Sequence, residues 1–381
     1  MQIPFAVLDD KILKQLSGRL IIVRLDLNLP IMGGKILDDY RLRLGVETIK
    51  KLKKARARIL IIAHLGDDKA SLKSVCQKLN RLTACNWVGS IENLKKIDIK
   101  PRQAVMLENL RYNPGEKKNN KSLAKTLASG ADYFLNDAFS VSHRRHMSIV
   151  GLPEFLPSLA GPVFVSEYQN LRQALKPKRP SILILGGAKF GTKLPLLKKF
   201  IDRFDQIYIG GALANPLLAF RGFPIGRSLS DNSGHGLKVL AQNQKLILPI
   251  DVWVDGPSGR RLCSVSQVGA KETIKDVGPQ FVKELDENLS TVEFVLWNGP
   301  LGDYENNFDG GTLGVAKVLA QSQAYLLAGG GDTVAVLRTA KIAEQFDFIS
   351  SAGGAMLDFL LNETLPGIEA LKKSKRKFKL T

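Results

Sequence analysis

Cysteine, aromatic side chains and long apolar runs are all scarce in this chain of 381 residues. The three cysteines, Cys76, Cys85 and Cys263, are odd in number and widely spaced. They form neither a metal-binding pattern nor a disulfide framework, which indicates a reducing compartment. Charges interrupt every strong apolar run before it reaches the length of a membrane span. The N-terminal segment has no basic region followed by an apolar core, so we expect no secretory signal and a cytoplasmic location.

Acidic residues are also few relative to basic ones. The chain has 55 Lys and Arg against 36 Asp and Glu, a formal charge of +19. Such an excess attracts polyanions such as nucleotides, phosphate esters or nucleic acid, or it is only a lysine-rich solvated surface. Aromatic residues make up 7% of the chain and are scattered, and no nucleic-acid-binding signature accompanies the basic C-terminal tail. We therefore expect that tail to be a frayed or surface-lying terminus.

Glycine, by contrast, recurs at one kind of place. In the second half of the chain, five apolar runs stop abruptly in glycine, which is typical of buried strands whose ends approach a ligand. Five such ends on one edge of a parallel sheet would present backbone N–H groups to phosphates, so the pattern predicts a nucleotide site. The runs are ILILGGAK (182–189), IYIGGALAN (207–215), VEFVLWNGP (292–300), YLLAGGGDT (325–333) and FISSAGGA (348–355).

The apolar runs of the first half end in charge instead. This difference indicates a site for a small charged ligand rather than for a nucleotide. The polar residues that follow these runs are Asp26, Asn28, His64, Glu108, Asn109, Arg111, Asn136, Asp137, His143, Arg144 and His146.

Helix-like stretches alternate with these strands, for example at 38–55, 120–131 and 162–175. Such alternation favours right-handed βαβ units and parallel sheets. The length suits two domains, so we predict an α/β protein of two doubly wound, Rossmann-like domains joined by a hinge helix. The expected bounds are 1–166 for the N-terminal domain, 167–180 for the helix and linker, and 181–360 for the C-terminal domain. Residues 361–381 are expected to return to the N-terminal domain.

Two common nucleotide motifs are absent. Residues 186–193 nearly spell the P-loop pattern, but Thr192 precedes Lys193, and the mechanics of that motif depend on the opposite order. No G-x-G-x-x-G opens a βαβ unit, which weakens a dinucleotide-dehydrogenase interpretation.

Eight segments in consistent order give the chain a family resemblance. Together they make it similar to the phosphoglycerate kinases from about Leu20 to about Leu371. The segments are VRLDLNLP (23–30), DDYRLR (38–43), AHLG (63–66), LENLRY (107–112), NDAFSVSHRRH (136–146), GGAKFGTK (186–193), WNGPLGDYE (297–305) and GGGDT (329–333).

The resemblance implies a glycolytic enzyme that transfers a phosphoryl group reversibly between 1,3-bisphosphoglycerate with ADP and 3-phosphoglycerate with ATP. The N-terminal domain would bind the triose acid, and the C-terminal domain would bind ATP or ADP with Mg²⁺. The substrate contacts implied by the family fall on Asp26, Asn28, Arg41, His64, Arg111 and Arg144. The implied nucleotide contacts fall on Lys189, Lys193, Gly211, Asn298, Glu305, Gly330, Gly331, Asp332 and Thr333.

Within that set, Asp332 would hold Mg²⁺, Glu305 would bind the ribose, and Thr333 would open a helix as its N-cap. A carboxylate nucleophile is already ionised at neutral pH, so no general base is required. Catalysis would then depend on positioning and on cations around the transferred group. We expect Arg41, Lys193 and Lys189 to supply them in a cleft that closes between two domains.

The chain departs from the family pattern at two places. Asp67 stands where the family usually has an arginine that touches the substrate, which predicts weakened triose binding. If so, an Asp67→Arg variant should have a changed KM. Ala352 replaces the first of three expected glycines, and Asp358 stands where Glu is usual.

These departures keep two alternatives open beside an active monomeric kinase. One is a degenerate paralogue that binds nucleotide without transferring phosphate. The other is a basic protein that binds nucleic acid on the same scaffold, although nothing besides the charge favours it, and no membrane partner is expected.

Overall fold

The computed structural model describes residues 3–66, 70–94, 96–231 and 236–380. Within these ranges the chain forms two compact units, one from residues of 1–169 and 364–381 and one from residues 170–363. The first dividing point falls inside helix α7 (Pro162–Leu175), and the second falls between Glu363 and Thr364. None of the described helices combines the length and the hydropathy needed to cross a membrane.

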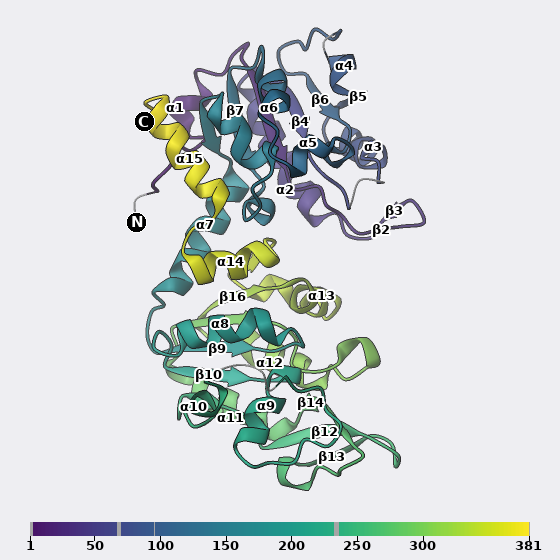
Figure 1. The fold of residues 1–381 in the computed structure, drawn as a ribbon, viewed down its shortest axis with the longest axis vertical. Coiled ribbons are helices and arrows are strands. Elements are labelled where there is room, and N and C mark those ends of the chain that lie inside the picture. Colours follow the sequence, from purple (N-terminus) through teal and green to yellow (C-terminus); the bar gives the residue numbers. More distant parts are fainter. Residues whose placement is uncertain (1–2, 67–69, 95, 232–235, 381) are drawn as a thin grey trace. The chain divides into compact units, whose positions relative to one another are not determined.

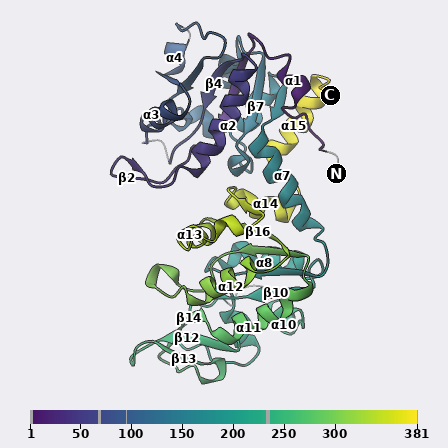
Figure 2. The ribbon, with the colours of Figure 1, turned by 180° about the vertical axis from the view of Figure 1, so that it is seen from behind.

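The first unit contains a six-stranded sheet in the order β5-β6-β4-β1-β7-β8, with every pair parallel. Alternate residues of one strand enter different cores: Ile21 and Val23 of β1 pack with α2 (Tyr40–Lys54), whereas Ile22 packs with α6 (Lys121–Ala128). Figures 1 and 2 show these two helices on opposite faces of the sheet. The strands are β1 (Leu20–Leu25), β4 (Arg58–Ile62), β5 (Asn86–Gly89), β6 (Ala104–Leu107), β7 (Tyr133–Asp137) and β8 (Ser158–Ala160), with a hairpin of β2 (Ile31–Met32) and β3 (Lys35–Ile36).

Local sequence accounts for the helices of this unit. In α2 (Tyr40–Lys54), the carboxylate of Asp38 accepts from the amide of Tyr40, and three lysines lie in the last turn, where the helix dipole favours cations. The other helices are α1 (Asp10–Leu13), α3 (Lys73–Leu82), α4 (Ile91–Leu94), α5 (Pro114–Lys117), α6 (Lys121–Ala128) and α15 (Pro366–Lys377).

The basic tail is not frayed, contrary to one of our two expectations. Helix α15 buries Leu371 and Ser374 and leaves most of its cationic side chains toward solvent. The Ser374 hydroxyl accepts from the amide of Ser158 at 3.0 Å and donates to the carbonyl of Leu156 at 3.1 Å. The tail therefore lies on the surface of the first unit as an ordered amphipathic helix.

The second unit contains the other parallel sheet, in the order β11-β10-β9-β15-β16-β17. The five glycine-ended runs form five adjacent strands of it, which confirms an α/β fold of two six-stranded parallel sheets. The strands are β9 (Ser181–Leu185), β10 (Gln206–Ile209), β11 (Leu246–Ile247), β15 (Phe294–Asn298), β16 (Tyr325–Gly329) and β17 (Phe348–Ser350).

Sequence analysis did not anticipate a small antiparallel sheet in this unit, ordered β13-β12-β14. Its strands are β12 (Asp251–Asp255), β13 (Arg261–Ser264) and β14 (Thr273–Val277). The helices of the unit are α8 (Phe190–Phe200), α9 (Asn215–Phe220), α10 (Leu237–Ala241), α11 (Pro279–Asn288), α12 (Gly310–Ala320), α13 (Gly331–Thr339) and α14 (Gly354–Asn362). Helix α8 lies on one face of the parallel sheet and α12 on the other (Figures 1 and 2).

Candidate active site

Asp26 organises the carboxyl end of β1. Its carboxylate lies 3.3 Å from Nε of Arg41 and accepts from the hydroxyl of Ser140 at 2.5 Å. Arg41 also donates to the carbonyl of Asn28 at 3.2 Å, and the Asn28 side chain accepts from the amide of Gly66 at 2.8 Å. The acid and the amide thus hold an arginine and the loop after β4, rather than serving only as turn residues.

A buried arginine holds the histidine at the end of β4. Arg24 is 1% exposed, and its Nη2 lies 3.0 Å from Nδ1 of His64, which is 2% exposed. A guanidinium can only donate, so Nδ1 of His64 must accept, and the ring proton sits on Nε2. Burial, together with the charges of Arg24, Arg111 and Arg144, lowers the pKa of His64 far below its usual value. His64 is therefore a neutral hydrogen-bond donor through Nε2.

Arg24 in turn needs an anionic partner because an isolated buried charge is costly. Its Nε donates to the Ser148 hydroxyl at 3.1 Å, and that hydroxyl donates to the carboxylate of Glu116 at 2.6 Å. Glu116 is fully buried, and it also accepts from the amide of Ser148 at 3.0 Å. Burial still lowers the pKa of Arg24, although Glu116 and Asp26 raise it. This network was not predicted from the sequence, in which the one available signal is a charged residue inside the apolar run LIIVRL.

Arg111 and Arg144 complete a cationic cluster with Arg24, and the neutral rings of His64 and His146 lie among these charges. Arg111 donates to the carbonyl of Gly66, and Arg144 lies 3.3 Å from the ring of His143. Burial, followed by the charges of Arg144, Arg111 and Arg24, lowers the pKa of His146 to about 4. Such a concentration of positive charge at a strand edge suits a small anion.

This edge therefore brings together all of the expected substrate residues that the structure describes. Asp67, where the chain departs from the family pattern, lies outside the described residues.

The ends of β9, β10 and β15 interlock through glycine. Gly187 and Gly211 have φ values of +85° and +60°, and a Cβ at Gly211 would lie 2.8 Å from the amide nitrogen of Gly187. The Gly187 amide donates to the carbonyl of Pro300 at 2.7 Å, and the Gly211 amide to that of Leu301 at 2.8 Å. Only glycine permits both the backbone conformation and the close approach.

Lys193 points from the first turns of α8 into this glycine edge. It is 7% exposed, and its amino group donates to the carbonyls of Gly186 and Asn298, the latter at 3.2 Å. Burial lowers the pKa of Lys193 to about 8; the charge of Asp332 opposes this shift, and that of Lys189 adds to it. Lys189 itself is exposed just before α8.

Thr333 is not the N-cap that we expected. Helix α13 begins at Gly331 with Gly330 as its cap residue, in a backbone conformation with φ of +100°. Thr333 lies inside the first turn, fully buried, and its hydroxyl accepts from the amide of Gly299 at 2.7 Å. The Asn298 amide similarly donates to the carbonyl of Gly329 at 2.9 Å. Both side chains therefore fasten β15 to the turn after β16.

Asp332 and Glu305 are brought together at Tyr304, a residue that sequence analysis missed. The Tyr304 hydroxyl donates to Asp332 at 3.3 Å, and burial together with the charges of Asp332 and Glu305 raises the pKa of Tyr304. Within the described ranges, no cluster of three or more His, Cys, Asp and Glu could hold a metal by itself. A single exposed carboxylate beside phosphate-binding turns still fits Mg²⁺, which commonly binds one or two carboxylates, waters and substrate phosphates.

The fifth glycine turn keeps its essential glycine. Ala352 is buried, and its amide donates to the Ser350 hydroxyl at 3.2 Å. Gly353 has φ of +55° and ψ of −124°, a backbone conformation that residues other than glycine avoid. The departure at Ala352 therefore falls beside the strained position, and Asp358 lies half-buried in α14.

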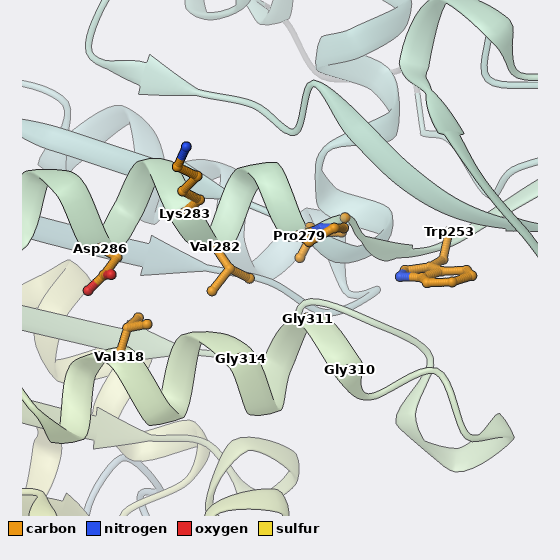
Figure 3. A pocket seen from close by; sticks show the side chains of 11 residues that line it. Trp253, Pro279, Val282, Lys283, Asp286, Gly310, Gly311, Gly314 and Val318 are labelled. Atoms are coloured by element: carbon orange, nitrogen blue, oxygen red, sulfur yellow. The ribbon is translucent and has the colours of Figure 1, made fainter.

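A separate hollow of about 430 Å³ lies between α11 and α12. Figure 3 shows Val282 and Asp286 of α11 facing Val318 of α12, with Trp253 at one end. None of the expected nucleotide contacts lines it. The glycine edge, and not this groove, carries the candidate chemistry.

The chain has two parallel sheets covered by helices. One sheet ends in a cationic cluster and the other in glycine turns around a buried lysine. These features define a two-domain kinase for a small anionic acceptor. Comparison with known proteins makes this specific. The family model described as phosphoglycerate kinase matches residues 10–363. The chain is 37% identical to a phosphoglycerate kinase of Novosphingobium aromaticivorans, over 97% of this chain and 99% of that protein. It is 36% identical to the one of Francisella tularensis subsp. novicida, over 94% and 96%.

Solved structures agree with this match. The phosphoglycerate kinase of Coxiella burnetii superposes with a TM-score of 0.84 at 35% identity, covering 94% of this chain and 97% of that one. The one of Pyrococcus horikoshii gives 0.85 at 27% identity, covering 95% and 98%. The chain belongs to the phosphoglycerate kinase family. Its activity is the glycolytic one, phosphoryl transfer between 1,3-bisphosphoglycerate with ADP and 3-phosphoglycerate with ATP, in a family that uses magnesium nucleotides.

Proposed function

We propose that the cationic cluster of the first unit binds the triose acid. The observation that carries this proposal is the buried pair of Arg24 and His64, set among Arg111 and Arg144 at the carboxyl edge of the sheet. A phosphorylated carboxylic acid is a small polyanion, and arginine forks match both of its charged ends. Neutral His64 adds a directed hydrogen bond through Nε2, while Asp26 and Asn28 hold Arg41 and the Gly66 loop in place.

The glycine edge of the second unit binds ATP or ADP in this proposal. Backbone N–H groups at Gly330 and Gly331 face the phosphates, because helix starts leave such donors open. Gly211 donates its N–H to the carbonyl of Leu301 and contributes by letting the nucleotide approach the backbone closely. Asn298 and Thr333 contribute by shaping the turn, and Glu305 binds the ribose.

Asp332 holds Mg²⁺ in this arrangement, through a carboxylate in the first turn of α13. When bound with nucleotide, the cation would offset charge on the β- and γ-phosphates. The carboxylate of the triose acid is the nucleophile, so no side chain has to remove a proton.

Arg41, Lys193 and Lys189 stabilise the charge of the transferred group. Lys193 starts from a buried position with two carbonyl acceptors. Phosphate oxygens would be better partners for a buried ammonium than these neutral carbonyls. All of these groups belong to one chain, so we propose that it acts as a monomer in the cytoplasm, where glycolysis takes place.

The test is ADP formation from MgATP that depends on 3-phosphoglycerate. We expect Arg41→Ala to lower kcat by at least ~100-fold, the scale for removing one preorganised charged donor. Arg43→Ala is the matched control, because Arg43 lies on the same helix, is exposed and pairs with Asp39. It should keep turnover near that of the unmodified protein.

Turnover of Arg41→Ala within threefold of the unmodified protein would remove Arg41 from the mechanism. Nucleotide binding without turnover would favour the degenerate paralogue instead. Salt-sensitive oligonucleotide binding without turnover would favour the nucleic-acid alternative.

A further inference from the structure

Two buried thiols of the first unit face each other, far from any role in phosphoryl transfer. Cys76 lies on α3, and Cys85 lies in the short connection between α3 and β5. Their sulfur atoms are 4.0 Å apart, and each residue is 3% exposed. The third cysteine, Cys263, belongs to β13 of the other unit.

Local contacts hold this pair in place. The amide of Thr83 donates to the carbonyl of Leu79 at 2.8 Å and ends the helix. The amide of Cys85 then donates to the side chain of Asn80 at 2.9 Å, which folds the connection back onto α3. Hydrogen bonds within residues 79–85 therefore help to bring the two thiols together, and both side chains also pack into the core of the first unit.

The connection lies close to solvent. Ala84 and Asn86, on either side of Cys85, are both exposed, and the carbonyl of Ala84 accepts from the amino group of Lys53. A disulfide requires the sulfur atoms to approach to about 2.05 Å. A change of side-chain rotamer with a small shift of residues 83–85, which lie between α3 and β5, would supply that movement.

The two sulfurs also differ in character. The hydrogen-bonding contact between the two sulfurs lowers the pKa of Cys76, whereas the same contact, together with burial, raises the pKa of Cys85. A thiolate is the nucleophile in thiol oxidation, so Cys76 is the first sulfur to react.

We propose that Cys76 and Cys85 form a redox-sensitive dithiol, a modification site at which a hydroperoxide produces an intramolecular disulfide. The Cys76 thiolate attacks the terminal peroxide oxygen, the O–O bond breaks, and hydroxide or alkoxide leaves and takes up the proton that the Cys76 thiol released, so that Cys76 becomes a sulfenic acid. The sulfur of Cys85 then attacks the sulfenic sulfur, and the hydroxyl leaves with the Cys85 proton as water. The two sulfurs supply the two electrons that reduce the peroxide, and a dithiol reductant reverses the step by exchange.

A tryptic map of the full-length protein tests this proposal directly. Trypsin cleaves after Lys73, Lys78 and Arg81, so Cys76 and Cys85 fall on the separate peptides 74–78 and 82–95. After hydrogen peroxide treatment of the folded protein, we expect these two peptides to appear as one disulfide-linked species. Both free peptides should be lost in step with its formation, and dithiothreitol should restore them.

Three variants control the experiment. Cys76→Ser and Cys85→Ser should each abolish the linked species, whereas Cys263→Ser should leave its yield unchanged. Trp87 lies two residues after Cys85, so a reversible change in tryptophan emission should accompany the link in the unmodified protein. If a variant does not fold, the peptide map of the unmodified protein is sufficient to test the proposal.

Oxidation of either peptide to sulfinic or sulfonic acid without a linked species would overturn the proposal. A disulfide from Cys76 to Cys263, or one between two molecules, would also overturn the proposal. So would thiols that stay unreacted at a peroxide concentration that oxidises an added free thiol.

Discussion

Lys193 should make the stability of this protein depend on pH in a way that one substitution removes. Burial lowers its pKa from the ordinary 10.5 to about 8. Each pKa unit corresponds to about 1.4 kcal/mol, so holding Lys193 charged in the unliganded fold costs about 3 kcal/mol at pH 7. Because the side chain is 7% exposed, solvent screens this cost little.

The sign follows from proton binding. Between pH 8 and 10.5 the unfolded chain keeps a proton on Lys193 that the folded chain has released, so stability rises with pH through this window. A Lys193→Met variant lacks the group and lacks the rise. The variant also loses the hydrogen bonds to Gly186 and Asn298, which changes its free energy of unfolding by the same amount at every pH.

The measurement is urea unfolding of both proteins at pH 7 and pH 10. We expect the stability of the unmodified protein, relative to Lys193→Met, to increase by about 2.5 kcal/mol between the two. Lys198→Met, at an exposed position of the same helix, is the matched control and should show no such change. A difference constant within ~0.5 kcal/mol would refute the reasoning, because titrations elsewhere are common to both proteins and cancel.

Two further predictions concern the glycine edge and the charge. Gly353→Ala should destabilise the protein by ~1–3 kcal/mol, whereas Gly354→Ala should be nearly neutral. A Cβ would meet nothing within 4 Å at either position, but only Gly353 has a positive φ. Equal urea midpoints for the two variants would contradict this prediction. In steady-state assays, kcat/KM for 3-phosphoglycerate should fall at least ~threefold when ionic strength rises from ~0.05 to ~0.5 M, because salt screens attraction to the first unit; a flat profile would exclude long-range steering.

Strand ends were the part of the site that the sequence could predict. Glycine and charge at the ends of apolar runs are local signals, and parallel strands bring their carboxyl ends to one edge. That logic placed Asp26 and His64 on one edge and Lys193 with Gly211 on the other, as the two sheets now show.

What escaped prediction depends on long-range contacts. The hydrogen bond from Arg24 to Ser148 spans 124 residues, and nothing near Arg24 in the sequence announces its partner. The prediction that Thr333 caps helix α13 was wrong for a different reason. Gly330 occupies the cap position, and the Thr333 hydroxyl accepts instead from Gly299, which follows another strand. The antiparallel strands β12 and β14 are also followed by glycine, at Gly256 and Gly278, but charged residues interrupt both segments, so neither forms the apolar run that marked the other strands.

The excess charge of the chain is not shared between its two units. Residues 1–169 and 364–381 carry 34 Lys and Arg against 17 Asp and Glu, whereas residues 170–363 carry 21 against 19. The second unit can remain nearly neutral because glycine N–H groups, helix starts and a divalent cation suit phosphates without many side-chain charges.

The described residues of the first unit include no such glycine edge, and in the proposed function this unit binds through side chains. Its cationic cluster accounts for only a few of its 17 surplus charges, and many of the others lie on exposed surfaces such as the end of α2 and the outer face of α15. Charges of that kind add little to binding at contact, but together they raise the local concentration of an anionic acid around the cluster. The +19 is therefore better explained by the unit that we propose to bind the small acid than by a need to hold ATP.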